Sequence, residues 1–234
     1  MIGLGTIVNS LSIIIGGGIG LIIKDGLKPR FQETLMSALG LATIFIGLSG
    51  AMSGMLKISN NLLETQGTML LIFSLVIGAL VGEFLNIEEK LEHLGEWLKS
   101  KIKTKKNDPF VEGFVTASLV VCVGAMAIVG SLQDGLLGDP STLFAKAILD
   151  FMIVMVFAST LGIGTLFSAL PVGVYQGCIT IFASFLKPIL TDTVIVNLSF
   201  VGSVLIFVVG INICFGKKVK AGNLLPAMIV PFFF

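Results

Sequence analysis

Two oppositely charged residues lie inside a long apolar segment. Lys146 and Asp150 occur in the stretch STLFAKAILDFMIVMVFAS. A charged side chain at the centre of a membrane helix costs about 3 kcal/mol on insertion scales, so such residues usually face a protein interior and mark a solute pathway or a proton site. Four residues apart, they share one helix face and can neutralise each other. The alternative is that Lys146 extends to the outer interface with Asp150 close behind it, since both fall in the first two turns.

Uncharged polar residues form a second candidate set. Asn9, Ser10 and Ser12 lie in the first apolar segment, and Asn197 and Ser199 lie at the matching place in the seventh. An Asn side chain offers an acceptor and two donors without a charge, which suits the coordination of a cation or a polar solute. Hydrogen bonding between helices is the commoner use of such residues. The candidate substrate- or ion-binding residues are Asn9, Ser12, Asp150, Asn197 and Ser199, with weaker candidates at Tyr175, Gln176 and Asn212.

No catalytic or metal-binding set can be assembled from the sequence. The single histidine, His93, lies in a charged segment, and Cys122, Cys178 and Cys214 lie in apolar runs without the spacing of a zinc site. The glycine cluster at residues 16–20 lacks the GxGxxG spacing and the Gly-Lys-Ser/Thr ending of nucleotide-binding loops. We therefore expect no enzymatic activity, no cofactor and no metal site.

The elements that must position these residues are membrane-spanning helices. Hydrophobic residues make up 55% of the 234 and charged residues 12%, with a mean hydropathy of +1.02, whereas soluble domains carry about 25% charged residues. Apolar runs near the length of a bilayer crossing, about 20 residues, recur along the chain. This pattern predicts an all-α polytopic integral membrane protein. The expected helices cover residues 5–23, 34–56, 68–86, 113–132, 144–168, 172–190 and 194–215.

A shorter apolar stretch, residues 224–234, ends the sequence and contains Pro226 and Pro231. As an α-helix it would rise about 16 Å, roughly half of a bilayer core. We expect a half-crossing or re-entrant end, or a short, tilted eighth helix.

Basic residues predict the orientation of the helices. All but three of the 15 Lys and Arg residues fall after the first, third and seventh expected helices. The exceptions are Lys57, Lys146 and Lys187. Because basic loops stay in the cytoplasm, the N-terminus is expected outside and the basic loops are expected on the cytoplasmic side.

The longest loop, residues 88–108, has the pattern of an amphipathic helix on the cytoplasmic surface. Leu91, Leu94, Trp97 and Leu98 are spaced by one, three or four residues, with Glu and Lys between them. Such a helix places its Trp at headgroup level and its lysines toward anionic lipid. The expected lipid-binding lysines are Lys99, Lys101, Lys103, Lys105 and Lys106. The net charge of +1 gives no reason to expect nucleic acid.

Two segments of the sequence also resemble each other, which indicates an internal repeat. GTIVNSLSIIIGGGIG, from Gly5, aligns without gaps on GTMLLIFSLVIGALVG, from Gly67. A weaker third copy begins at Ile195, so we expect one transmembrane domain, residues 1–234, with parallel helix-hairpin repeats at about 5–56, 67–132 and 195–234. Small residues four apart on one helix face let another backbone approach closely. Such pairs are Gly16/Gly20, Gly50/Gly54, Gly78/Gly82 and Gly173/Gly177.

The opening GTIVNSLSIIIGGGIGLIIK and the later FQETLMSALGLATIFIGLSGAM resemble the bacterial inner-membrane proteins of the YdfK/YqgA-like family, a domain-of-unknown-function family. The resemblance covers nearly the whole chain. It implies a protein of about this size in a bacterial cytoplasmic (inner) membrane, without an established substrate.

Two functions remain open from the sequence. The first is a transporter or channel for a small solute or ion, with the pathway near the first, third and seventh helices. The second is a non-transporting scaffold or sensor that acts through the basic cytoplasmic loop, and either could form a homo-oligomer. A transporter would hold a hydrated cavity at Asn9, Asn197 or Asp150, whereas a scaffold would bond these groups internally.

Overall fold

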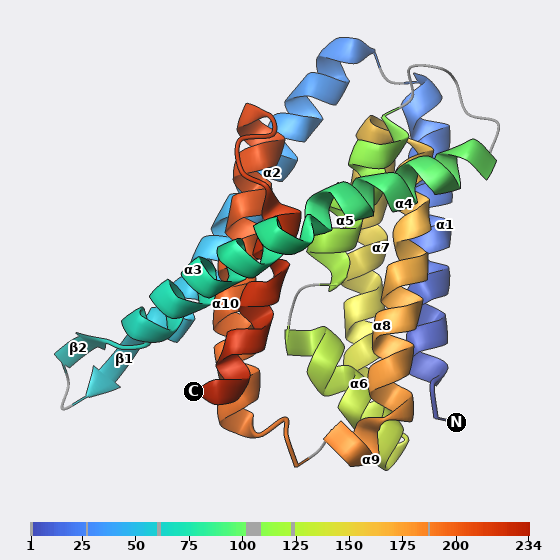
Figure 1. Cartoon of the computed structure of the whole chain (residues 1–234). Helices are drawn as coiled ribbons and strands as arrows, with labels where there is room; N and C mark the ends of the chain where they lie inside the picture. Colours follow the sequence, from blue (N-terminus) through green and yellow to red (C-terminus); the bar gives the residue numbers. More distant parts are fainter. Residues whose placement is uncertain (1, 27, 60–61, 102–108, 123–124, 187) are drawn as a thin grey trace. The chain divides into compact units, whose positions relative to one another are not determined.

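The polypeptide is built almost entirely of helices, which confirms the predicted all-α fold (Figure 1). The computed structural model describes residues 2–26, 28–59, 62–101, 109–122, 125–186 and 188–234. In chain order the elements are α1 (Leu4–Gly26), α2 (Pro29–Met55), β1 (Leu56–Ser59), β2 (Leu62–Thr65), α3 (Thr68–Leu85), α4 (Ile87–Lys101), α5 (Phe110–Cys122), α6 (Ala125–Leu137), α7 (Ser141–Leu161), η1 (Ile163–Ser168), α8 (Ala169–Ile181), α9 (Ala183–Leu186), α10 (Asp192–Phe215) and η2 (Ala221–Phe233).

The long apolar helices agree with the expected membrane spans. Within the described residues, six helices are long and apolar enough to cross a membrane, and the pair α5 and α6 makes a seventh if it is one span. The span expected at residues 113–132 is not one straight helix, because the two halves of that pair differ in direction by 62°. The chain is thus a polytopic α-helical membrane protein.

Two of the expected spans end earlier than the sequence suggested. The span expected at residues 144–168 stops at Leu161, where Gly162 has a φ of +81° and the chain changes to the 3-10 helix η1. Only glycine adopts this backbone conformation readily, so it ends the α-helix there. The span expected at residues 172–190 is the continuous stretch of η1 and α8, which ends at Ile181.

The helices gather into two compact units. Unit 1 comprises Met1–Ala38, Leu91–Cys122 and Met126–Lys187, and unit 2 comprises Leu39–Lys90, Val123–Ala125 and Pro188–Phe234. The single domain and its three repeat units, expected from the sequence, stay predictions.

In unit 1, α1 packs closely along α7 (Figure 1). A methyl group at Gly16 would lie 2.5 Å from the carbonyl oxygen of Phe151, and one at Gly20 would clash with that of Met155. The partner's residue number rises with that of the glycine, so the two helices run parallel. Ile13 and Val154 lie in the core between them. The glycine pair therefore acts as the expected packing face.

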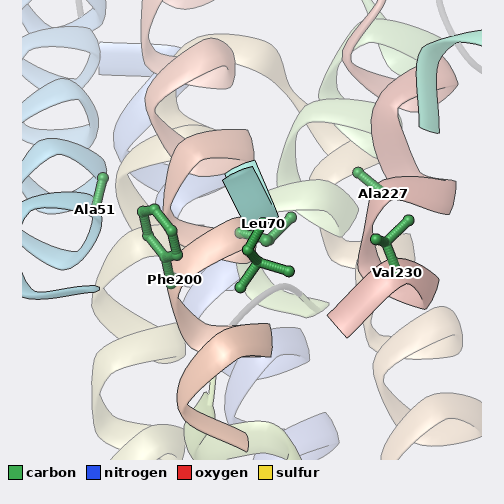
Figure 2. Close-up of a cluster of buried hydrophobic side chains, with 6 residues drawn as sticks. Ala51, Leu70, Phe200, Ala227 and Val230 are labelled. Atoms are coloured by element: carbon green, nitrogen blue, oxygen red, sulfur yellow. The ribbon is translucent and has the colours of Figure 1, made fainter. Parts of the chain in front are cut away.

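In unit 2, the second glycine pair packs against the C-terminal helix. A methyl group at Gly78 would lie 2.5 Å from the backbone nitrogen of Ala227, and one at Gly82 would clash with the carbonyl of Asn223. The partner's number falls as the glycine's rises, so α3 and η2 run antiparallel. Leu70 of α3 lies between Phe200 of α10 on one side and Ala227 and Val230 of η2 on the other (Figure 2).

The other two glycine pairs differ from each other. Gly50 and Gly54 of α2 face Ser203 and Phe200 of α10, as the packing interpretation requires. On α8, Gly173 approaches the hydroxyl of Ser10, but among the described residues no atom of another element lies within 4 Å of a methyl group placed at Gly177. The packing expectation was therefore wrong for Gly177.

The C-terminal stretch is longer in space than the sequence suggested. η2 is a 3-10 helix of 13 residues with Pro226 and Pro231 inside it. A 3-10 helix rises about 2.0 Å per residue, so η2 extends about 26 Å, close to the thickness of a bilayer core. The shorter length expected from the sequence assumed an α-helix that begins at residue 224, whereas η2 is a 3-10 helix that begins at Ala221.

Two short strands between α2 and α3 are not predicted by the sequence. β1 and β2 pair antiparallel, with Leu56 opposite Thr65 and Ser59 opposite Leu62. The helix expected at residues 34–56 therefore ends at Met55, and β1 begins at Leu56.

The amphipathic segment forms helix α4, which ends at Lys101. Part of its apolar face is covered by protein, since Leu98 packs against Phe110 and Phe114 of α5. Leu94 and Trp97 remain exposed. The predicted lipid-binding residues Lys103, Lys105 and Lys106 lie outside the described residues.

Candidate functional site

The charged pair of α7 is buried and makes direct contacts. The Lys146 Nζ donates to Asp150 Oδ1 at 2.8 Å and lies 2.8 Å from Oδ2. The two side chains are 9% and 3% exposed to solvent. Such burial differs from the arrangement in which Lys146 extends away to the interface. The pair instead lies within the helices of unit 1.

Asn9 of α1 completes this cluster. Its Nδ2 donates to Asp150 Oδ2 at 3.0 Å, and the residue is fully buried. The structure thus brings together two of the predicted site residues from positions 141 apart. Small residues on α1 permit the contact, because Gly5 and Gly16 let the backbone approach Leu143 and Phe151 of α7.

A second buried carboxylate, Asp134 of α6, lies at the start of α1. Its Oδ2 accepts the backbone N–H of Gly5 at 3.0 Å. The side chain is fully buried. Sequence reasoning missed Asp134 because the expected span ended at residue 132, which placed the carboxylate in a loop. Its hydrogen bond to the Gly5 N–H at the start of α1 joins positions 129 residues apart, so no local sequence pattern indicates it.

Helix α8 adds a buried amide to the same unit. Gln176 is fully buried, and in the part of the chain that the structure describes neither its Oε1 nor its Nε2 has a hydrogen-bond partner. One turn before it, Gly173 faces Ser10 of α1. One turn after it, the Thr180 hydroxyl donates to the Ser131 carbonyl of α6 at 3.3 Å. Gln176 therefore lies on the face of α8 that meets α1 and α6.

Unit 1 holds most of the buried polar atoms without a partner among the described residues. They are Thr6 Oγ1, Asn9 Oδ1, Ser10 Oγ, Ser118 Oγ, Ser131 Oγ, Asp134 Oδ1 and both amide atoms of Gln176. Leaving such a group unsatisfied costs about 1–3 kcal/mol. The interior of unit 1 is consequently suited to bind a polar solute or ion that offers hydrogen-bond donors and acceptors to these atoms.

The remaining predicted site residues do not join this cluster. Ser12 is half-buried on α1. Asn197 and Ser199 belong to unit 2, where the Ser199 carbonyl accepts the Ser203 hydroxyl at 2.7 Å. Asn197, with Gln66 and Asp192, lines a surface pocket of about 390 Å³. The sequence match between Asn9 and Asn197 therefore links residues of different units.

The weaker candidates have separate environments. Asn212 closes the turn after α10: its Oδ1 accepts the backbone N–H groups of Lys218 and Val219, and its Nδ2 donates to the Val219 carbonyl at 2.7 Å. This pattern is structural. Tyr175 is half-buried on α8. Among the described residues, no group of three or more His, Cys, Asp or Glu side chains could hold a metal ion.

Unit 2 contains a polar network that was also missed. Asn223 of η2 accepts the backbone N–H of Glu88 at 2.8 Å and donates to Glu83 at 2.7 Å. Glu88 in return accepts the Gly222 N–H at 2.9 Å and pairs with Lys217 at 2.6 Å. These contacts fix the start of η2 to the junction of α3 and α4.

Outside the spans, Asp139 precedes α7. The backbone N–H of Ser141 donates to its Oδ1 at 3.0 Å. Hydrogen bonds from Ser141 lower the pKa of this exposed carboxyl below its ordinary value. Asp139 therefore stays ionised at neutral pH and accepts the first backbone N–H of the helix that carries Lys146 and Asp150.

Comparison with known proteins places the chain in a family. The family model described as "Protein of unknown function (DUF554)" matches residues 4–234. The chain is 34% identical over 228 residues to the "Uncharacterized membrane protein YdfK" of Bacillus subtilis (strain 168), covering 97% of this chain and 93% of that protein. It is 26% identical over 231 residues to the "Uncharacterized protein YqgA" of Escherichia coli (strain K12), covering 97% and 94%. No solved structure matches it. The chain therefore belongs to the DUF554 family of membrane proteins, in agreement with the resemblance read from its sequence.

Proposed function

We propose that this protein is a transporter or channel for a small solute or ion, and that the substrate meets the buried polar groups of unit 1. The observation that carries the proposal is the cluster of Lys146, Asp150 and Asn9 inside a helical bundle. Two buried charges in a membrane helix are expensive, so they are usually retained for a pathway or a proton site. The proposed role is transport rather than catalysis.

Buried polar atoms without hydrogen-bond partners favour a transport role over a purely structural one. A structural ion pair needs only the contact between its two charged groups, and Lys146 and Asp150 make that contact. Asn9 Oδ1, Asp134 Oδ1 and the amide of Gln176 have no hydrogen-bond partner among the residues with described positions, although all three residues are fully buried. These groups extend the polar interior over α1, α6 and α8, and they can bind a substrate as it passes. The bend between α5 and α6 also fits a transporter, because discontinuous helices often form the binding sites in such proteins.

We further propose the bacterial cytoplasmic membrane as the location, with the N-terminus outside. The basic residues after α1, α3 and α10 support this orientation. Asn9 lies five residues after Leu4, about 8 Å along α1. In this orientation the polar cluster lies in the outer half of the membrane, and a substrate would reach it from the extracytoplasmic side.

Reconstitution tests the transport proposal directly. Purified protein in liposomes would be exposed to steps of Na⁺, K⁺, H⁺ and small polar solutes while currents and light scattering record charge movement and swelling. We expect a response above that of empty liposomes for at least one of these, and its loss in Asp150→Asn. No response to the whole set would contradict the proposal.

A charge-swapped variant separates a pathway role from a structural one. Lys146→Asp with Asp150→Lys keeps the pair but moves the carboxylate by one helix turn. Restored stability without transport would support a substrate site at Asp150. Full transport in the swapped variant would mean that the pair is structural.

The scaffold or sensor function is the second candidate, and α4 favours it. Trp97 is 56% exposed, and the ammonium of Lys101 lies 5.8 Å from the centre of its ring. We propose that this end of α4 binds anionic lipid. Because Trp97 is the only tryptophan, its fluorescence reports on α4 alone. Its emission should shift to the blue in phosphatidylglycerol liposomes relative to phosphatidylcholine, and the shift should shrink in Lys99→Glu with Lys101→Glu.

A further inference from the structure

We infer that α1 and α6 form a binding site for a monovalent cation, with Asp134 Oδ1, Ser131 Oγ and Asn9 Oδ1 as its ligands. The inference deepens the proposed function, on which its role in transport rests, by naming the class of bound species. Binding itself can be measured without any transport assay, so the two proposals can fail separately.

The two carboxylate oxygens of Asp134 differ in their contacts. Oδ2 accepts the Gly5 N–H, whereas Oδ1 is buried and has no hydrogen-bond partner among the described residues. The other charged side chains buried in the described part of unit 1 are Lys146 and Asp150, which neutralise each other. Asp134 is therefore the buried carboxyl group in the described part of unit 1 that lacks a basic partner.

Two further oxygens lie on the same helix faces. Ser131 precedes Asp134 by three residues on α6, and Asn9 follows Gly5 by four residues on α1, so each lies one turn from the Asp134–Gly5 contact. Both residues are fully buried, and Ser131 Oγ and Asn9 Oδ1 have no partner. A carboxylate, a hydroxyl and an amide oxygen are ligands suited to a hard cation.

The hydrogen bonds that these residues already make fix their orientation. The Asn9 Nδ2 donates to Asp150, which leaves its oxygen as the free atom. Asp134 is held in the same way by Gly5 through one oxygen only. A role limited to capping α1 would use Oδ2 and would not explain why Oδ1, Ser131 Oγ and Asn9 Oδ1 are all buried without partners.

The test is the thermal stability of the purified full-length protein in different cations. The unfolding temperature would be measured in NaCl, KCl and choline chloride at equal ionic strength and at one pH. Na⁺ or K⁺ at about 100 times its half-saturating concentration should raise the unfolding temperature by about 5 °C or more relative to choline.

Variants assign the effect to the site. Asp134→Asn keeps the shape of the side chain and should abolish the dependence on Na⁺ or K⁺. Asp139→Asn is the matched control, because this carboxylate is exposed and five residues away, and it should retain the dependence. If Asp134→Asn does not fold, Ser131→Ala should raise the half-saturating concentration about tenfold by removing one ligand. Equal unfolding temperatures in all three salts, or a dependence that Asp134→Asn or Ser131→Ala leaves unchanged, would overturn the site.

Discussion

The contact between Lys146 and Asp150 predicts a large energetic coupling. At 2.8 Å two unit charges attract by about 6 kcal/mol at an effective dielectric constant of about 20. Desolvation of both groups offsets most of this gain, so the pair as a whole contributes little relative to two apolar residues. Removing one partner is different, because the remaining charge keeps its desolvation penalty. Asp150→Asn and Lys146→Met should each lower the free energy of unfolding by about 3–5 kcal/mol.

The double variant provides the decisive comparison. Lys146→Met with Asp150→Asn removes both charges and leaves an amide that can still accept from Asn9. Its stability should lie within about 1 kcal/mol of the wild type, which implies a coupling energy of several kcal/mol between the two positions. The measurement is reversible unfolding in mixed micelles by denaturing detergent, followed by circular dichroism.

An exposed pair in the same chain serves as the control. The Lys220 Nζ lies 2.5 Å from Glu83 Oε1, but the two side chains are 58% and 56% exposed to solvent. Their coupling should not exceed about 1 kcal/mol. If the Lys146–Asp150 coupling were as small as this, the two groups would be solvated, and the argument from buried charge would be refuted.

Three other predictions follow from particular contacts. Gly20→Leu and Gly82→Leu should sharply reduce the yield of folded protein, because each new side chain would clash with the backbone of a neighbouring helix. Gly18→Leu is the control and should not reduce the yield, since no described atom of another element lies within 4 Å of a methyl group there. Equal yields of all three variants would refute the packing argument. Asn223→Ala should lower the free energy of unfolding by about 2 kcal/mol, since it leaves the Glu88 N–H without its partner, while Lys220→Ala should cost less than about 1 kcal/mol. In a variant without the native cysteines, Gly3→Cys should react with an impermeant thiol reagent outside intact cells and Ser100→Cys should not; reaction of both would contradict the topology.

The membrane spans could be predicted because the bilayer imposes a length and an apolar composition that are visible locally. Asp150 could be singled out for the same reason, since a charge within an apolar run is conspicuous. Asp134 lacked this signal, because the expected helix ended at residue 132, five residues before the real end at Leu137, so that Asp134 was assigned to a loop. The Glu88–Asn223 contact, across 135 residues, depends on how α3 and η2 pack. The 3-10 geometry of η2 was likewise not evident from its composition.

The two glycine-bearing segments that resemble each other show how far such a resemblance can be used. In both, the paired glycines meet a neighbouring backbone, but α1 runs parallel to its partner and α3 runs antiparallel to its own. Gly5 donates a helical N–H to Asp134, whereas the aligned Gly67 has a φ of +69° and precedes its helix. Asn9 aligns with Leu71, an apolar residue. The glycine pattern thus predicts where backbones can approach, and the polar site depends on residues that only one of the two segments carries. The repeat itself stays a prediction, but a function assigned from α1 should not be transferred to α3.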